Sequence, residues 1–204
     1  AASCKPVFEA MVAAGELKAE DVWARVRLAL ELGNLSVARQ VAETLPEVQK
    51  TGFREVEKVA ENPQRFLDAG NADLHGRPER ELTMFAIYRL ARSQPPVALT
   101  YWNQVRPRFS LEEQRYVWGQ MAFHAARKHD PVALQWFNEA GDTPMNELQV
   151  TWRVRAALRL QDWQQVLDGI AAMPEELQNQ GAWRYWKARG LKASGKTAAA
   201  NAIL

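Results

Sequence analysis

The sequence predicts an all-α fold: an α-superhelix, or solenoid, of antiparallel helix pairs similar to tetratricopeptide repeats. The first observation is a repeated segment. Pro96–Leu99 and Pro131–Leu134 carry the same four residues 35 positions apart, and each copy is followed by one polar residue, two aromatic residues and asparagine. A period of that size is typical of stacked two-helix units. The second observation is that apolar and polar residues never alternate for more than a few positions, so no strand is expected.

Small residues in the middle of helices extend the repeat along the chain. They recur in steps of 33 to 35 residues, except for one gap that spans two units. A degenerate copy fits that gap at residues 62–67, where Asn62 and Pro63 open a short helix. A small residue leaves a notch that a large side chain of the partner helix can fill. The aligned positions are Ala38, Ala98, Ala133, Val166 and Ala199.

In the first half of the chain, helix starts and stops follow proline, glycine and the spacing of apolar residues. A first helix begins at Pro6 and ends before Gly15. Gly33 supplies a C-cap between the two helices of the first complete pair. Turn-forming residues predict an irregular loop at 70–76. The helices expected after the first one cover residues 20–32, 35–45, 53–61, 63–69 and 78–92.

In the second half, polar caps mark the helix starts more clearly. Ser110 and Glu113 have the spacing of a capping box, which predicts a long helix over residues 111–128. Asp130 is expected to cap the next helix, with Pro131 at its first position and its end near residue 140. The other helices are expected at residues 95–105, 148–160, 162–173, 183–193 and 196–204.

Composition narrows the class of protein. With 204 residues, of which 47% are apolar and 25% charged, the chain can bury a core. A net charge of +2 lacks the clustered positive excess of a nucleic-acid binder, so no nucleic-acid partner is predicted. No membrane span is expected, because no uninterrupted apolar run approaches the roughly 18 residues that one needs. Cys4, the only cysteine, is either a free thiol or half of a disulfide with a partner outside the chain.

The common catalytic, cofactor-binding and metal-binding motifs are absent from the sequence, so no catalytic residue, cofactor site or metal site is predicted. His124 and His129 are the only nearby histidine pair. Five positions separate them, or roughly 140° around a helix, so they cannot share one ligand. His129 is expected at a helix C-terminus, where a charged imidazole gains about 0.3–1 kcal/mol from the helix dipole.

Eight tryptophans are many for this length, and they allow two interpretations. Aromatic groups such as Tyr101 with Trp102, or Trp183 with Tyr185 and Trp186, could stack on sugar rings or bases. In helix-pair repeats, however, a large aromatic residue also fills the notch opposite a small one, and this explains the regular recurrence. Core packing is the favoured interpretation, with Trp186 or Tyr185 as the exposed exception.

Basic residues gather toward the end of the chain. From Pro144 onward there are eight lysines and arginines against five acidic residues. They could line one surface on which an anionic polymer would feel their summed field, although a merely solvated face has the same composition. The residues concerned are Arg155, Arg159, Arg184, Lys187 and Lys192.

One segment resembles a known family. Residues 182–188 read Ala-Trp-Arg-Tyr-Trp-Lys-Ala, and they are followed by a helix, Gly195 and the alanine-rich residues 198–204. This resembles the superhelical domain of the large periplasmic soluble lytic murein transglycosylases. The resemblance extends back through residues 153–158, 60–63 and 27–34, and so covers most of the chain. The Trp-Arg-Tyr-Trp element is its most specific part.

The resemblance implies a role in peptidoglycan cleavage and turnover in the periplasm. In that family a superhelix forms a ring with a linker domain, and a separate lysozyme-like domain cleaves the glycan with a glutamate that is followed by serine. No Glu-Ser pair exists here, so no catalytic position carries over, and the chain alone is expected to be inactive. Residues 1–204 are then a single superhelical domain, a fragment without the first helices and without the linker and catalytic domains.

The resemblance also suggests partners and a site. Peptidoglycan and the linker and catalytic domains of the same parent chain are the expected partners, and an oxidising periplasm suggests that Cys4 pairs with a cysteine in a preceding segment. The candidate glycan-binding residues are Arg155, Arg159, Arg184, Tyr185, Lys187 and Lys192. The alternative is a tetratricopeptide-like module that binds a protein or peptide in its groove, because repeat length does not separate the two.

Overall fold

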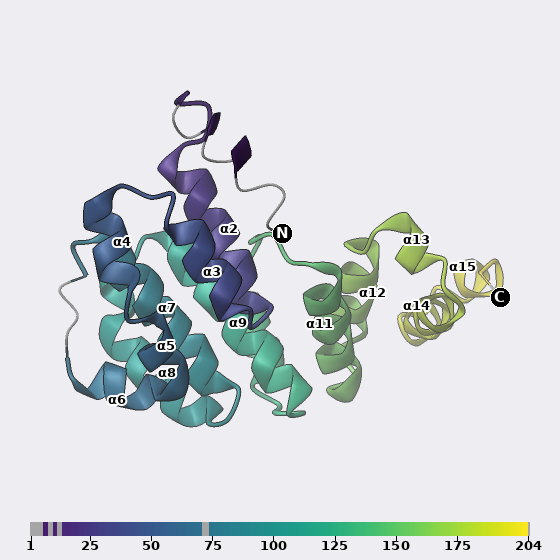
Figure 1. The fold of residues 1–204 in the computed structure, drawn as a ribbon. Helices are drawn as coiled ribbons and strands as arrows, with labels where there is room; N and C mark the ends of the chain where they lie inside the picture. The colour runs from purple at the N-terminus through teal and green to yellow at the C-terminus, as the bar shows by residue number, and fades with distance from the viewer. Residues whose placement is uncertain (1–5, 8–9, 12–13, 71–73, 204) are drawn as a thin grey trace. The chain divides into compact units, whose positions relative to one another are not determined.

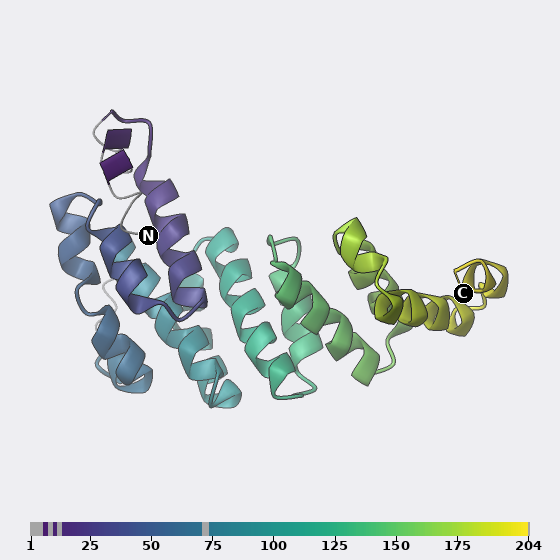
Figure 2. The ribbon, with the colours of Figure 1, turned by 45° about the vertical axis from the view of Figure 1, so that its right-hand side comes forward.

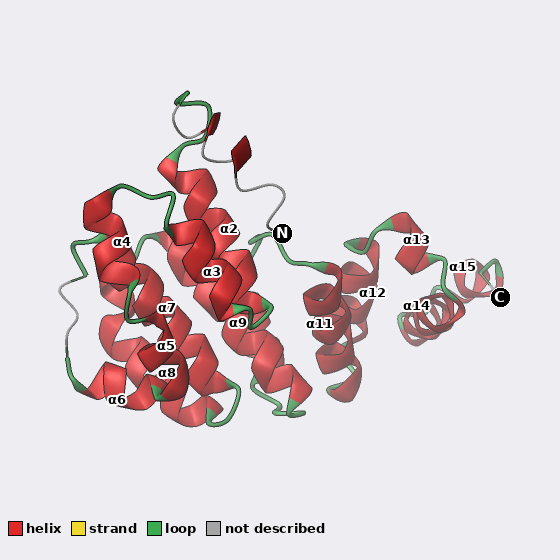
Figure 3. Ribbon diagram, viewed as in Figure 1, coloured by secondary structure: helices red, strands yellow, loops and turns green. Residues whose placement is uncertain are grey.

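The described part of the chain is entirely helix and loop, as Figure 3 shows, which confirms the predicted all-α class. The computed structural model describes residues 6–7, 10–11, 14–70 and 74–203. They group into two compact units, Ala1–Leu90 and Ala91–Leu204, each of which has its own core. Cys4 lies outside the described residues, so its pairing stays a prediction.

The first unit begins with an antiparallel pair, α2 (Ala19–Glu31) and α3 (Leu35–Ala42), visible in Figure 1. Gly33 turns the chain between them with φ +72°, and the Asn34 side chain caps α3 by accepting a bond from the Val37 N–H. This pair was predicted, although α3 ends three residues earlier than expected. The other helices of the unit are α4 (Glu47–Phe53), α5 (Val56–Glu61), α6 (Pro63–Asp68) and α7 (Arg77–Ala91).

The prediction around Phe53 was wrong. Phe53 ends α4 instead of opening the next helix, and its ring packs edge-on against Trp23, with ring centroids 5.4 Å apart. No helix was expected between residue 45 and residue 53, where α4 lies with Pro46 as its N-cap. A residue that is 1% exposed is held by the core, and that packing outweighs the weak local preference of a seven-residue helix.

A buried ion pair joins α2 to α7 in this unit. Glu81 on α7 is 2% exposed and accepts two bonds from the Arg27 guanidinium of α2, at 2.8 Å each. Arg77 donates a third bond at 2.6 Å from the same helix as Glu81. Both carboxylate oxygens of Glu81 are therefore engaged, by one arginine from α2 and one from α7 itself.

The second unit contains the clearest helix pairs, α9 with α10 and α11 with α12, which run side by side in Figures 1 and 2. The predicted capping box is confirmed, because Ser110 accepts from the Glu113 N–H and Glu113 accepts from the Ser110 N–H. A second box, formed by Asn146 and Gln149, was missed. The helices are α8 (Pro95–Val105), the 3₁₀ turn η2 (Arg106–Arg108), α9 (Leu111–Arg127), α10 (Ala133–Ala140), α11 (Glu147–Arg159), α12 (Trp163–Ala171), α13 (Glu175–Gln178), α14 (Gly181–Ala193) and α15 (Thr197–Asn201).

The predicted start of α10 was wrong by two residues. Asp130 does not cap the helix: its Oδ1 accepts from the Val132 N–H at 3.0 Å and closes a short turn through Pro131. The helix begins at Ala133. The side chain of Asp130 reaches only two residues ahead, so the turn it stabilises competes with a helix start at proline.

One backbone motif recurs at the corners between paired helices. In each, a residue with positive φ is followed by one whose N–H bonds the carbonyl five residues back, a Schellman turn. The residues with positive φ are Gly33, His129, Gln161 and Gly195, and the bonds run from Asn34 to Ala29 (2.8 Å), Asp130 to Ala125 (3.0 Å), Asp162 to Ala157 (3.0 Å) and Lys196 to Leu191 (2.8 Å). These corners fix the register of the repeat.

The small residues lie where close packing requires them, with one correction. Ala38, Ala98, Ala133 and Val166 are all fully buried, as predicted. The last aligned position was wrong: Ala199 is exposed and Ala200 is 2% exposed, because α15 begins at Thr197 and turns the neighbouring alanine inward.

The tryptophans mostly fill the core, as favoured. Trp102, Trp118 and Trp136 form a chain of ring contacts in the second unit, with centroids 6.3 Å and 5.9 Å apart. Trp23 and Trp183 are buried as well. Only the half-buried tryptophans, Trp152, Trp163 and Trp186, retain surface for a ligand.

Candidate functional site

An arginine stacked between two tryptophans connects α11 to α14 on the second unit. Arg155 is exposed, and its guanidinium carbon lies 4.9 Å from the ring centroid of Trp152 and 5.7 Å from that of Trp183. Trp183 is 6% exposed and so belongs to the core, whereas Trp152 is half-buried. Stacking of this kind contributes about 0.5–1 kcal/mol at an accessible site and fixes the direction of the guanidinium.

A second aromatic–arginine pair lies on α14. Tyr185 is 45% exposed, and the Arg189 guanidinium lies 5.9 Å from its ring centroid and donates to its hydroxyl at 3.2 Å. The Trp186 ring meets Tyr185 edge-on at 5.1 Å. On α9, Arg127 stacks on Phe123 in the same way, at 5.6 Å. Each pair joins an aromatic residue to an arginine three or four positions later, which places both on one face of the helix.

The predicted site residues fall into two groups. Arg155 and Arg159 are both exposed and lie one turn apart on α11. On α14, Arg184 donates to the Ile203 carbonyl, Lys187 is half-buried and Lys192 is exposed. Lys187 and Lys192 are five positions apart, or roughly 140° around the helix, so the basic residues of α14 do not form one patch.

The sequence analysis missed three residues of this surface, namely Trp152, Arg189 and His129. The spacing of an aromatic residue and an arginine three or four positions later could have found the first two, because it recurs on α9, α11 and α14. His129 had been placed correctly at the end of its helix but given only a structural role. Tyr185 was correctly expected to be exposed.

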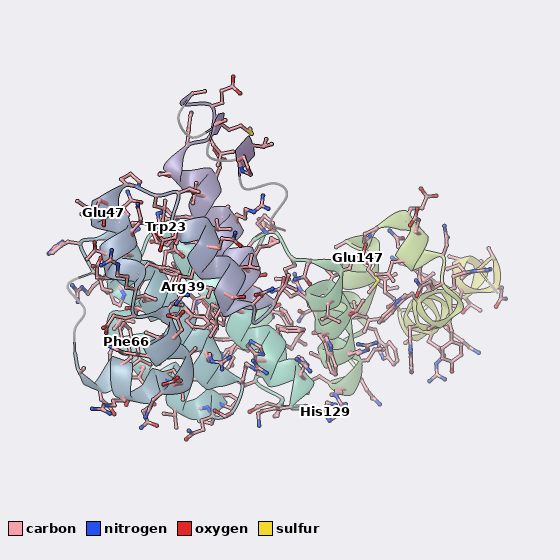
Figure 4. All side chains as sticks on the ribbon, in the orientation of Figure 1. Trp23, Arg39, Glu47, Phe66, His129 and Glu147 are labelled. Atoms are coloured by element: carbon pink, nitrogen blue, oxygen red, sulfur yellow. The ribbon has the colours of Figure 1, made fainter. Side chains whose placement is uncertain are left out.

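A small pocket opens beside Trp152, where α9 ends and α11 ends. Its volume is about 220 Å³. The His129 ring forms part of its wall and lies 6.1 Å from the ring centroid of Trp152; Figure 4 labels His129 at this end of the helices. The lining combines small apolar groups with one cation and one carboxylate: Ala126, His129, Asp130, Pro131, Ala156, Arg159 and Leu160.

The chemistry of this surface suits binding. Partly exposed aromatic faces can stack on the C–H faces of sugars, and guanidinium groups pair with carboxylates through parallel bonds. The described residues hold no cluster of three or more histidine, cysteine, aspartate or glutamate side chains that could bind a metal ion. The buried carboxylates that they contain, Glu81 and Glu113, are engaged by arginines and by a helix cap.

Comparison with known proteins places the whole chain in one group of relatives. No family model matches it. The soluble lytic murein transglycosylases of Salmonella typhimurium and Escherichia coli K12 are 24% and 23% identical to it over 99% of its length. An inactive mutant of the lytic transglycosylase Slt from Pseudomonas aeruginosa matches 100% of the chain with a TM-score of 0.68 and 27% identity. The chain is a homologue of the soluble lytic murein transglycosylases.

The homology covers the whole chain and agrees with the family that residues 182–188 suggested. It extends over the chain as a whole, and the structural match fits the superhelical domain of these enzymes. The chain spans about a third of the length of the curated relatives it matches, 32% in each case, and 33% of the solved structure. No helix in the described ranges is both long enough and apolar enough to pass through a membrane.

Proposed function

We propose that this chain is the non-catalytic superhelical scaffold of a lytic murein transglycosylase. Its role in peptidoglycan turnover is to shape the enzyme and to hold peptidoglycan while another part of the longer protein cleaves the glycan. The best support is the structural alignment. The helix pairs match a solved lytic transglycosylase over the whole of this chain, but this match covers only a third of the solved protein. The proposal also places the protein in the periplasm, where murein lies.

We call Trp152, Arg155, Arg159 and Tyr185 the aromatic–arginine surface, and this surface supplies the means of holding peptidoglycan. Arg155 and Arg159 point their charge outward from α11, and the peptide stems of peptidoglycan carry carboxylates. Trp152 is half-buried and Tyr185 is 45% exposed, so each keeps some ring surface beside its stacked arginine, and ring surface of this kind packs on sugars. The attraction between exposed charges is screened over roughly 8 Å at physiological salt, so binding that depends on them should weaken as salt is raised.

Sedimentation with isolated murein sacculi tests the binding role. The purified chain is expected to bind sacculi at low salt and to be released as salt rises. The double variant Arg155→Glu/Arg159→Glu, which reverses two exposed charges on α11, should bind several-fold more weakly. A matched control, Arg92→Glu/Arg108→Glu, reverses two exposed charges elsewhere in the second unit and should bind like the parent. If the variant and the control lose sacculus binding equally, net charge alone explains the loss. If neither loses binding, the reversed residues do not belong to the binding site.

Product analysis tests the scaffold role. Residues 1–204 alone are expected to release no 1,6-anhydromuropeptides from sacculi, whereas the whole protein should release them. Glycan cleavage needs a protonated carboxylic acid beside the scissile bond, and the buried carboxylates of the described residues are already engaged as ion-pair and cap partners. Release of these products by residues 1–204 above a heat-killed control would overturn the assignment of the chain as a scaffold.

A further inference from the structure

The pocket between the ends of α9 and α11 lies at two helix corners that carry a side chain at the position of positive φ. Two residues with positive φ lie at the pocket. His129, with φ +62°, is one of the lining residues, and Gln161, with φ +55°, directly follows the lining residue Leu160. The equivalent corners elsewhere use glycine, namely Gly33 and Gly195. A residue with a side chain in this conformation is strained by roughly 1–3 kcal/mol, and such strain is retained where the surroundings or function require it.

The lining defines the chemistry of a ligand. Arg159 is exposed on the last turn of α11 and presents a guanidinium suited to a carboxylate. One carboxylate oxygen of Asp130 accepts a hydrogen bond from the Val132 N–H, and the other oxygen can accept one from an N–H of a ligand. Most of the apolar lining is small, namely Ala126, Pro131 and Ala156, and Leu160 adds one larger apolar side chain. A methyl group suits this lining better than a large side chain.

We infer that this pocket binds the carboxyl-terminal end of a short peptide whose last residue is the size of alanine. The terminal carboxylate pairs with Arg159 and with an N–H of the His129 ring, the last peptide N–H donates to Asp130, and the methyl group lies on the small apolar lining. The pocket volume of about 220 Å³ is enough for a dipeptide end. Because this inference rests on the proposed function, the occupant is the D-alanyl end of a peptidoglycan stem peptide.

The test is an NMR titration of the full 204-residue chain with N-acetyl-D-alanyl-D-alanine as the probe. The amide resonances of residues 126–130 and 156–160 should shift together and saturate. The carboxyl-amidated probe should bind at least about tenfold more weakly, since a hydrogen bond to a charged group is worth that much. A probe that ends in D-phenylalanine should also bind more weakly, because Ala126, Pro131 and Ala156 line the pocket for a small side chain. Shifts outside the two segments only, or equal binding of the amidated probe, would overturn the site.

Two variants separate binding from folding. Arg159→Gln should weaken binding at least about tenfold, while Arg108→Gln, at an exposed arginine outside the pocket, should not change it. His129→Gly should raise the melting temperature, because glycine relieves the strained corner, and should still weaken binding. If His129→Gly stabilises the chain and binds as well as the parent, histidine has no part in the site.

Two further outcomes are decisive. The L-alanyl-L-alanine probe represents the end of a protein chain, so tighter binding of the L than of the D probe would overturn the stem peptide as occupant. Sacculus binding separates this inference from the proposed function. If the chain binds sacculi but not the D probe, the pocket assignment fails and the scaffold stands. If it binds the D probe but not sacculi, the pocket stands and the aromatic–arginine surface fails.

Discussion

Gly169 of α12 lies close to Val154 of α11, and the effect of Gly169→Ala on stability should change sign when Val154 is also replaced by alanine. A Cβ atom at this position would lie 2.6 Å from Val154 Cγ2, far inside ordinary contact. Val154 is fully buried on α11, and a β-branched side chain in a helix has essentially one rotamer, so the methyl group cannot turn away. The helix pair can relieve the contact only by moving apart.

Two opposing magnitudes decide the outcome for Gly169→Ala. Alanine in a helix interior is favoured over glycine by about 1 kcal/mol. Overpacking a tight core costs about 1–3 kcal/mol. The net expectation is therefore a destabilisation of about 0–2 kcal/mol in the parent. In a Val154→Ala background the methyl group is gone, and the same change should stabilise the chain by about 1 kcal/mol.

Urea unfolding followed by helical circular dichroism measures the four free energies of this cycle. The coupling between the two positions should be about 1–3 kcal/mol, as expected for side chains in contact. Gly181→Ala is the control, because no atom lies within 4 Å of its added Cβ, and its effect should be the same in both backgrounds. If Gly169→Ala changes the free energy of unfolding by the same amount in the parent and in the Val154→Ala background, the proposed close contact between α11 and α12 is wrong.

Three other predictions can be measured in the same way. Ala133→Leu should lower the free energy of unfolding by about 1–3 kcal/mol, because Ala133 is fully buried in the α9–α10 pair; an unchanged unfolding midpoint would contradict this. Glu81→Gln should destabilise the chain by about 3–5 kcal/mol, since it leaves two arginines without their buried anion, whereas Glu57→Gln at the exposed pair with Arg39 should change stability by about 1 kcal/mol or less. For Cys4, which lies outside the described residues, thiol titration of the longer protein under oxidising conditions should find no free thiol, and a reactive thiol would contradict the predicted disulfide.

The sequence by itself determined the fold class and most helix starts. Ser110 with Glu113 and the proline at the start of α8 act on backbone groups within three or four residues, so their effect can be read locally. The repeat likewise placed Ala98 and Ala133 in the core, because a buried small residue recurs once per helix pair. The resemblance at residues 182–188 pointed to the relatives that the comparisons then showed.

Tertiary structure alone decided the exact registers and the site. Phe53 ends its helix because packing against distant residues outweighs propensities of a few tenths of a kcal/mol in a short helix. Ala200 rather than Ala199 faces the core because α15 begins at Thr197, a start that the alanine-rich sequence does not mark. The stacking of Arg155 on Trp183 joins helices that are separated by α12 and α13 in the chain. The pocket at His129 combines the ends of two repeats, and no local pattern encodes which side chains meet there.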